Sequence, residues 1–195
     1  SAGTASNVVP AMAEAVFAVR PEAKLPLNGG LPAGITLASS SNGSLTVRAE
    51  GKACPASAPE AGDNALAKLV AFISGFDFAP GGAKEFVDKL AELSADSRHG
   101  AGFGVAGADM LSQLTLVPSM LAIGAEGGVL TCDMRLPVSK TSGDYLPLLV
   151  TLATENGMHF RQKFCQEPLF LGEDHPLVQT LLAVYREVSG DASAQ

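Results

Sequence analysis

The sequence predicts an α+β protein with two similar lobes, each an antiparallel sheet with helices on one face. Two observations predict this class. Residues 35–40, 45–50 and 129–138 alternate between apolar and polar side chains, which indicates half-buried strands. Residues 66–73 and 86–93 place apolar side chains at steps of three and four, which indicates helices. The second half of the chain repeats the order of strands and then helices, so a second lobe of similar build is expected.

In the first lobe, an apolar stretch at residues 13–20 predicts the opening strand. The pair Asn42-Gly43 between residues 35–40 and 45–50 predicts a hairpin, because this dipeptide tolerates the positive φ angles of tight turns. A helix is expected over residues 63–74 with Gly75 as its stop, and a second amphipathic helix over residues 86–93. Residues 94–107 are rich in glycine and predict the connection between the lobes.

The second lobe is predicted from the remaining patterned segments. Residues 114–117 and 128–138 are expected strands, with Leu130, Cys132 and Met134 on one face and Thr131, Asp133 and Arg135 on the other. A helix should begin near Asp144, carry Pro147 in its first turn and end at residues 155–157. A strand over residues 159–167 is expected next. The last helix should start at Asp174-His175-Pro176 and stop at Gly190.

Composition narrows the possible partners. The 195-residue chain has 20 acidic against 13 basic residues and a net charge of -7, without a basic cluster, so nucleic acid is not an expected partner. The apolar runs are too short and interrupted for a membrane span, so no membrane partner is expected either. The three cysteines are widely spaced, which argues against a disulfide framework and a structural zinc site and favours a cytoplasmic setting.

Four segments carry a resemblance to a known family. Residues 3–10, 51–65, 130–138 and 174–191 resemble, in order and spacing, the lid (dimerisation-type) domain of dizinc exopeptidases, the clan of aminoacylases, carnosinases and bacterial dipeptidases. The resemblance implies a ferredoxin-like lid. It assigns residues 1–10 to a hinge from a catalytic domain, 11–98 to lobe one, 99–170 to lobe two and 171–195 to a return segment into that domain.

The resemblance also implies a function. The parent protein would be a zinc-dependent dipeptidase, whose catalytic domain holds two zinc ions (or a similar divalent metal) and whose lid contacts the dipeptide substrate. The lid itself should hold no metal, and His99, His159 and His175 are isolated, so each is expected to be solvated or to cap a helix. The fragment alone is expected to be inactive. Because two lobes in one chain can imitate the dimer of single-lobed relatives, the parent is expected to be a monomer.

Arg135 and Asn7 are the candidate substrate-binding residues. Arg135 matches the arginine of a family Arg-x-Pro motif that binds the terminal carboxylate of the substrate, and the planar guanidinium suits that geometry. The alternative for Arg135 is a surface ion pair with Asp133. Asn7 matches a family asparagine that hydrogen-bonds the substrate backbone, and the alternative is an asparagine that stabilises a turn.

Pro55 stands where the family has a histidine that stabilises the oxyanion. Proline has neither a side-chain donor nor a backbone N–H, so it cannot replace the imidazole. The neighbouring Cys54 is a poor donor and is expected to be a small buried residue. This difference leaves a second hypothesis open, in which the parent is a catalytically impaired homologue that acts as a peptide-binding or dimerisation module.

Overall fold

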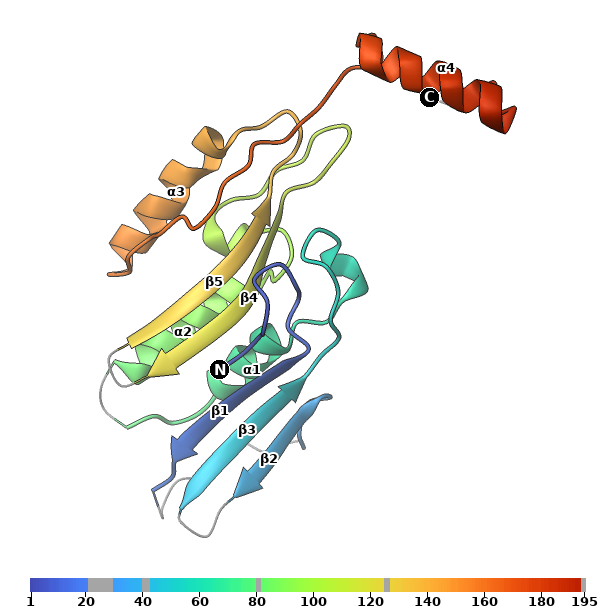
Figure 1. The fold of residues 1–195 in the computed structure, drawn as a ribbon. Helices are drawn as coiled ribbons and strands as arrows, with labels where there is room; N and C mark the ends of the chain where they lie inside the picture. The colour runs from blue at the N-terminus through green and yellow to red at the C-terminus, as the bar shows by residue number, and fades with distance from the viewer. Residues whose placement is uncertain (21–29, 40–42, 80–81, 125–126, 194–195) are drawn as a thin grey trace.

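The computed structural model describes residues 1–20, 30–39, 43–79, 82–124 and 127–193. Strands β1 (Met12–Ala18), β2 (Ile35–Ser39) and β3 (Ser44–Glu50) form an antiparallel sheet in the order β1-β3-β2. Strands β4 (Thr115–Gly124) and β5 (Gly127–Arg135) form a second antiparallel sheet. Helices α1 (Ala65–Ile73) and α2 (Ala83–Ser94) lie behind the strands in Figure 1, and α3 (Ser142–Glu155) lies beside β5. The predicted α+β class with two small antiparallel sheets is confirmed.

In the described part of the chain, Ala2 joins the two sheets. The N–H and carbonyl of Ala2 exchange hydrogen bonds of 2.8 and 3.0 Å with Leu121 of β4, and Ala2 also forms a bridge with Ala13 of β1. Ala2 therefore acts as a strand one residue long between β1 and β4. Residues 1–10, predicted as a hinge, make backbone hydrogen bonds to both sheets in this structure.

Gly3 allows the first residues to approach the backbone of β4 closely. Its φ is +72°, and a Cβ at this position would lie 2.0 Å from the carbonyl oxygen of Ser119. Ser119 follows Pro118 at a β-bulge in β4, where the register with β5 shifts. Glycine is thus required both by the left-handed backbone and by the close approach of the bulge.

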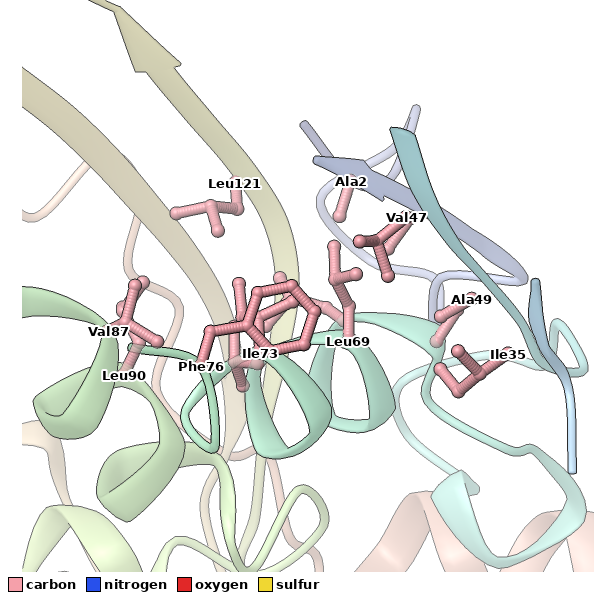
Figure 2. Close-up of a cluster of buried hydrophobic side chains, with 14 of the residues drawn as sticks. Ala2, Ile35, Val47, Ala49, Leu69, Ile73, Phe76, Val87, Leu90 and Leu121 are labelled. Atoms are coloured by element: carbon pink, nitrogen blue, oxygen red, sulfur yellow. The ribbon is translucent and has the colours of Figure 1, made fainter. Parts of the chain in front are cut away.

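The apolar side chains form two main cores. The first lies between the β1-β3-β2 sheet and the helices α1 and α2, and Leu45, Val47 and Ala49 point into it as the alternation of β3 predicts. Figure 2 shows that Leu121 of β4 and Val87 and Leu90 of α2 belong to this core as well. The second core holds Leu93 of α2 together with Leu114, Leu116 and Tyr145. Helix α2 therefore packs into both cores.

Helix α1 is fastened to β4 by its N-cap. The side-chain oxygen of Asn64 accepts hydrogen bonds from the N–H groups of Leu66 and Ala67 at 3.0 and 3.1 Å. Its Nδ2 donates to the carbonyl of Pro118 at 2.9 Å, and the residue is buried. One side chain thus starts the helix and ties it to the bulge of the second sheet.

Two sequence predictions for the second lobe are wrong. Residues 159–167 form no strand: they run extended and exposed beside β5, because a β-prone segment becomes a strand only where another strand bonds to it. Pro147 lies in the second turn of α3, not the first, because the helix begins at Ser142. The carboxylate of Asp144 accepts bonds from the N–H and hydroxyl of Thr141 and fixes that earlier start.

The predicted hairpin between β2 and β3 is confirmed by their antiparallel register. Gly43 has φ +76°, and residues 40–42 of the predicted turn lie outside the described residues.

The last helix, α4 (Pro176–Ser189), ends at Gly190 with φ 73°, as predicted. None of its residues is buried, and Figure 1 shows it projecting from the body of the molecule. Its exposed apolar side chains are Leu177, Leu181, Val184, Tyr185 and Val188. Among the described residues, no helix has the length and apolar character to cross a membrane.

Candidate functional site

A cavity of about 940 Å³ lies between β5, α3 and residues 158–169. Its walls include apolar side chains of the second core, and its lining also contains cationic side chains of Arg135, Arg161 and Lys163. Asn7, from the opposite end of the sequence, lines the same cavity. The structure thus brings together the two residues that the sequence predicts to contact substrate.

Arg135 ends β5 opposite Thr115 of β4. Its Nε donates to Asp133 Oδ1 at 2.7 Å and its Nη2 to Oδ2 at 3.2 Å, so the predicted ion pair exists. A guanidinium has five N–H donors, and Asp133 takes two of them. The edge formed by Nη1 and the second hydrogen of Nη2 has no partner among the described residues. That edge can still bind a carboxylate with two parallel hydrogen bonds.

The backbone of Asn7 is fixed while its side chain stays available. Its carbonyl accepts a hydrogen bond from the N–H of Ala56 at 2.9 Å, and Val9 N–H donates to the carbonyl of Cys54 at 2.9 Å. The side-chain amide is exposed and makes no hydrogen bond with the described part of the chain. A free amide offers both a donor and an acceptor, which is what recognition of a peptide group requires.

Pro55 lies next to Asn7 but does not line the cavity. It forms a backbone bridge with Val8, and its carbonyl accepts the N–H of Ala58 at 3.0 Å. Its ring is exposed. The neighbouring Cys54 is half-buried against Val9, Ala56 and Val117, and its thiol donates to the carbonyl of Ala58 at 3.3 Å. The loop of residues 54–62 is thereby held in one conformation beside Asn7.

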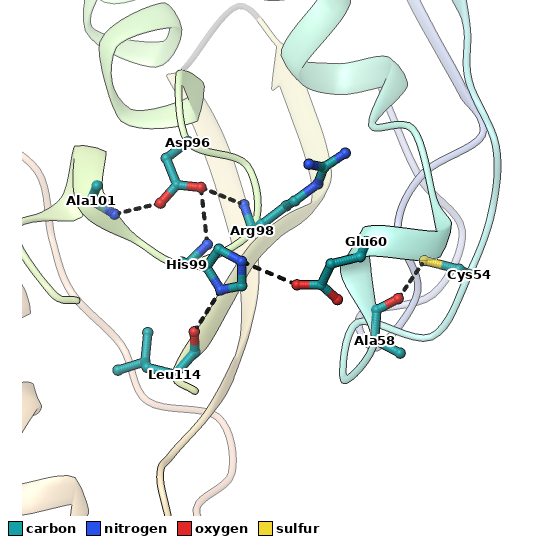
Figure 3. A network of polar contacts seen from close by, with 8 residues as sticks. All are labelled: Cys54, Ala58, Glu60, Asp96, Arg98, His99, Ala101 and Leu114. Carbon is teal, nitrogen blue, oxygen red and sulfur yellow. Dashed lines mark hydrogen bonds and ion pairs between the residues drawn. The ribbon is translucent and has the colours of Figure 1, made fainter. Parts of the chain in front are cut away.

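The three histidines have different environments. His175 caps α4 by accepting the N–H of Leu177 at 3.2 Å, as expected of a capping histidine. His159 is exposed and lines the cavity. His99 departs from the prediction: its side chain is only 25% exposed and contacts Glu60 and Leu114 (Figure 3). No sequence signal marks the contact with Glu60, because the two residues are distant in the chain and belong to no shared motif.

The described residues do not fit a zinc centre. They contain no group of three or more His, Cys, Asp or Glu side chains that could hold a metal ion. No chemical step is therefore assigned to a metal bound by these residues.

The cysteines should differ strongly in reactivity. Burial raises the pKa of Cys132 to about 12, and the negative charge of Asp133 adds to this increase. Burial also raises the pKa of Cys54, and the negative charge of Glu60 makes a smaller contribution in the same direction. Cys165 is exposed. Because the thiolate is the reactive form, iodoacetamide at about pH 8 should modify Cys165 first, Cys54 more slowly and Cys132 last. Peptide mass spectrometry over time measures this order, and early labelling of Cys132 in the folded protein would contradict it.

Comparison with known proteins relates the chain to one class of enzyme. No protein-family profile matches the chain. The chain is 30% identical over 142 residues to a Beta-Ala-Xaa dipeptidase of Lactobacillus delbrueckii subsp. lactis, a match that covers 72% of this chain. The match covers 30% of the dipeptidase, so the chain spans under a third of that relative's length. The chain is therefore related, at low identity, to a dipeptidase.

Proposed function

We propose that this chain is the substrate-binding lid of a longer dipeptide hydrolase. The main support for the proposal is that Asn7 and Arg135, which are far apart in the sequence, line the same cavity. Arg135 would bind the C-terminal carboxylate of the dipeptide, and Asn7 would hydrogen-bond its peptide group. The similarity to a Beta-Ala-Xaa dipeptidase supports substrates of that class. The groups that activate water would come from the rest of the longer protein, in agreement with the partial coverage of the relative.

The free apolar face of α4 supports the same proposal. Most helices of this length are stabilised by packing of an apolar face, and α4 leaves five large apolar side chains exposed. In the longer protein this face would pack on the catalytic domain. Residues 171–195 would then be the return segment that the resemblance implies.

Dipeptide affinity tests the role of Arg135. Replacing Arg135 by alanine should weaken binding of β-Ala-Ala about ten- to hundred-fold, because a charge-assisted bidentate pair is lost. Calorimetric titration of the 195-residue chain measures this, and KM of the longer protein should rise in parallel while its metal content stays unchanged. Arg48→Ala is the matched control, since Arg48 is also a strand arginine paired with a carboxylate, Glu14, at 2.5 Å, but lies on β3. Equal effects of the two substitutions would refute the assignment.

A substrate analogue without the C-terminal carboxylate measures how much this group contributes to binding. The C-terminal amide of β-Ala-Ala keeps the peptide group and removes the negative charge, so it should bind weakly to the native chain. With the amide, Arg135→Ala should cause little further loss of affinity, because the amide already lacks the carboxylate that Arg135 would bind. An amide that binds as tightly as the acid would show that Arg135 does not read the carboxylate.

Pro55 favours a second candidate function, binding of peptides without hydrolysis. The exposed proline offers no oxyanion donor at the family position, while Asn7 and Arg135 remain. In that case the longer protein would bind dipeptides with the same dependence on Arg135 and show no turnover. Assaying hydrolysis by the longer protein separates the two functions.

A further inference from the structure

A strap, residues 158–169, forms one wall of the candidate cavity. It follows α3 and passes between α3 and β5 on the way to α4 (Figure 1), and all of its residues line the cavity. Residues 159–167 are exposed and belong to no helix or strand. Within the described part of the chain, no backbone hydrogen bond joins these residues to β5 or α3. The strap can therefore move without breaking a backbone hydrogen bond of either element.

Two side chains attach the strap to the neighbouring elements. The Nζ of Lys163 donates to the hydroxyl of Thr131 in β5 at 3.3 Å. The carboxylate of Glu167 accepts the N–H of Ser142 in α3 at 2.9 Å, and its other oxygen accepts the Ser142 hydroxyl. The bond of Lys163 is long for a hydrogen bond, whereas Glu167 forms two bonds to one residue. We call the contact between Glu167 and Ser142 the latch.

The latch uses the start of α3. Ser142 is the first residue of this helix, so its N–H has no acceptor within the helix. A negative charge at a helix N-terminus is also favoured by the helix dipole. The hydrogen bonds from the hydroxyl and the N–H of Ser142 hold the pKa of Glu167 below its usual value. The carboxylate is thus ionised at neutral pH, and the latch is a charge-assisted contact.

Helix α3 does not depend on the latch. Its capping box is complete without Glu167, because the carboxylate of Asp144 accepts both the N–H and the hydroxyl of Thr141. The negative charge of Asp144 also acts on Glu167 and opposes its ionised form. Glu167 is exposed, so water can replace its partner. The latch can therefore open while α3 stays folded.

The strap also contributes positive charge to the cavity. Arg161 and Lys163 are two of the three arginine and lysine residues that line it, and neither forms an ion pair with a described residue. The two carboxylates in the lining already have partners: Asp133 is paired with Arg135, and Glu167 bonds to Ser142. The charge of Arg161 and Lys163 is thus not compensated, and an anion in the cavity would be attracted to the strap.

We propose that the strap is a gate of the cavity. The latch holds it closed, and its opening admits a ligand between β5 and α3. An anionic ligand inside the cavity favours the closed gate through Arg161 and Lys163. The identity of that ligand, a dipeptide with a free carboxylate, rests on the proposed function, whereas the opening of the gate is a property of the chain without ligand.

The native cysteines report opening of the gate. Cys132 lines the cavity from β5 and packs against the second core, so a small reagent can reach it through the cavity when the strap moves away. Cys54 lies in a separate cluster with Val9, Ala56 and Val117 and does not line the cavity. Iodoacetamide labelling at one fixed pH, followed by peptide mass spectrometry, gives both rates in one sample. A change at Cys132 alone reports the gate, because loss of the whole fold would expose both thiols.

Removing the latch tests the gate without ligand. Glu167→Ala should increase the labelling rate of Cys132 about three- to ten-fold and leave that of Cys54 unchanged, because an exposed charge-assisted contact is lost. Glu167→Gln keeps an acceptor for Ser142 without the charge, so its rate should lie between those of the native chain and Glu167→Ala.

Glu173→Ala is the matched control. Glu173 is an exposed carboxylate on the same connection to α4, and only its backbone carbonyl is bonded, to the Nε2 of Gln179. Its removal should leave both labelling rates at their native values. The proposal is overturned if Glu167→Ala labels Cys132 at the native rate, if Cys54 accelerates equally, or if Glu173→Ala has the same effect as Glu167→Ala.

A second measurement adds the ligand. At ten times its Kd, β-Ala-Ala should slow labelling of Cys132 in the native chain about ten-fold, because a ligand that requires the closed gate shifts the chain to that state. The C-terminal amide of β-Ala-Ala at the same concentration should slow it much less, since it lacks the anion. The double variant Arg161→Gln/Lys163→Gln should lose most of the slowing by β-Ala-Ala.

The two measurements can fail separately. If calorimetry detects no binding of β-Ala-Ala while Glu167→Ala still accelerates Cys132, the proposed function is rejected and the gate remains. If β-Ala-Ala binds with the expected dependence on Arg135 but Glu167→Ala labels like the native chain, the gate alone is rejected. If β-Ala-Ala binds and the double variant shows the full slowing, Arg161 and Lys163 do not hold the gate on the ligand.

Discussion

Replacing Gly3 by alanine should lower the free energy of unfolding by about 2–5 kcal/mol, one of the largest effects expected for a change of a single methyl group in this chain. The new Cβ would lie 2.0 Å from the carbonyl oxygen of Ser119, which is backbone and cannot rotate away. The left-handed φ of +72° adds a second penalty. Urea denaturation followed by circular dichroism measures the change.

Gly104→Ala separates the two penalties. Gly104 also has a left-handed backbone, with φ +67°, but a Cβ there would meet nothing within 4 Å. This substitution should cost only about 1–2 kcal/mol, which is the penalty of the backbone conformation alone. If Gly3→Ala is no more destabilising than Gly104→Ala, the close approach of residue 3 to the β4 bulge is not a constraint on the folded protein.

Replacing Pro55 by histidine should raise kcat of the proposed longer hydrolase about 10²–10³-fold, because the imidazole would supply the oxyanion donor that the family resemblance implies at this position. The ring of Pro55 is exposed, so an imidazole fits there without disturbing the cores. The carbonyl of residue 55 can still accept the N–H of Ala58. Steady-state kinetics with β-Ala-Xaa dipeptides, at equal metal content, measures the gain.

Pro55→Ala controls for the loss of the proline ring. It frees the backbone in the same way but supplies no side-chain donor, so kcat should not rise. If both variants gain equally, the effect comes from the backbone and not from the imidazole. If neither gains activity, the histidine at this position is not what limits hydrolysis.

The elements of the first lobe could be predicted from the sequence because their signals are local. The alternation of Leu45, Val47 and Ala49 places them in the core, and the spacing of Leu66, Leu69, Val70 and Ile73 gives α1. The predictions that are wrong concern segments whose structure depends on residues far away in the sequence. Residues 159–167 have the composition of a strand, but no edge bonds to them, and no local pattern records whether a partner strand is met.

The candidate site could be predicted only in part for the same reason. Asn7 and Arg135 are found from motifs, and the structure shows them at one cavity. The contact of His99 with Glu60 arises from packing of the loop 54–62 against the connection between α2 and β4, and neither residue stands in a pattern that names the other. No motif predicts that residues 158–169 line the cavity. These residues were expected to form a strand, and they line the cavity because they pair with no other strand.

The role of Ala2 sets an order for folding. The β2-β3 and β4-β5 pairs each form between neighbouring segments, and local contacts form fast, whereas β1 pairs with β3 across a longer stretch. The bonds between Ala2 and Leu121 close a much longer stretch of chain, so they should form late. During synthesis, Ala2 and β1 leave the ribosome long before Leu121 does. Until then, the N–H and carbonyl of Ala2 that bond to Leu121 have no partner in β4. Association of unfinished chains through these unpaired groups is therefore an expected route to aggregation before Leu121 is made.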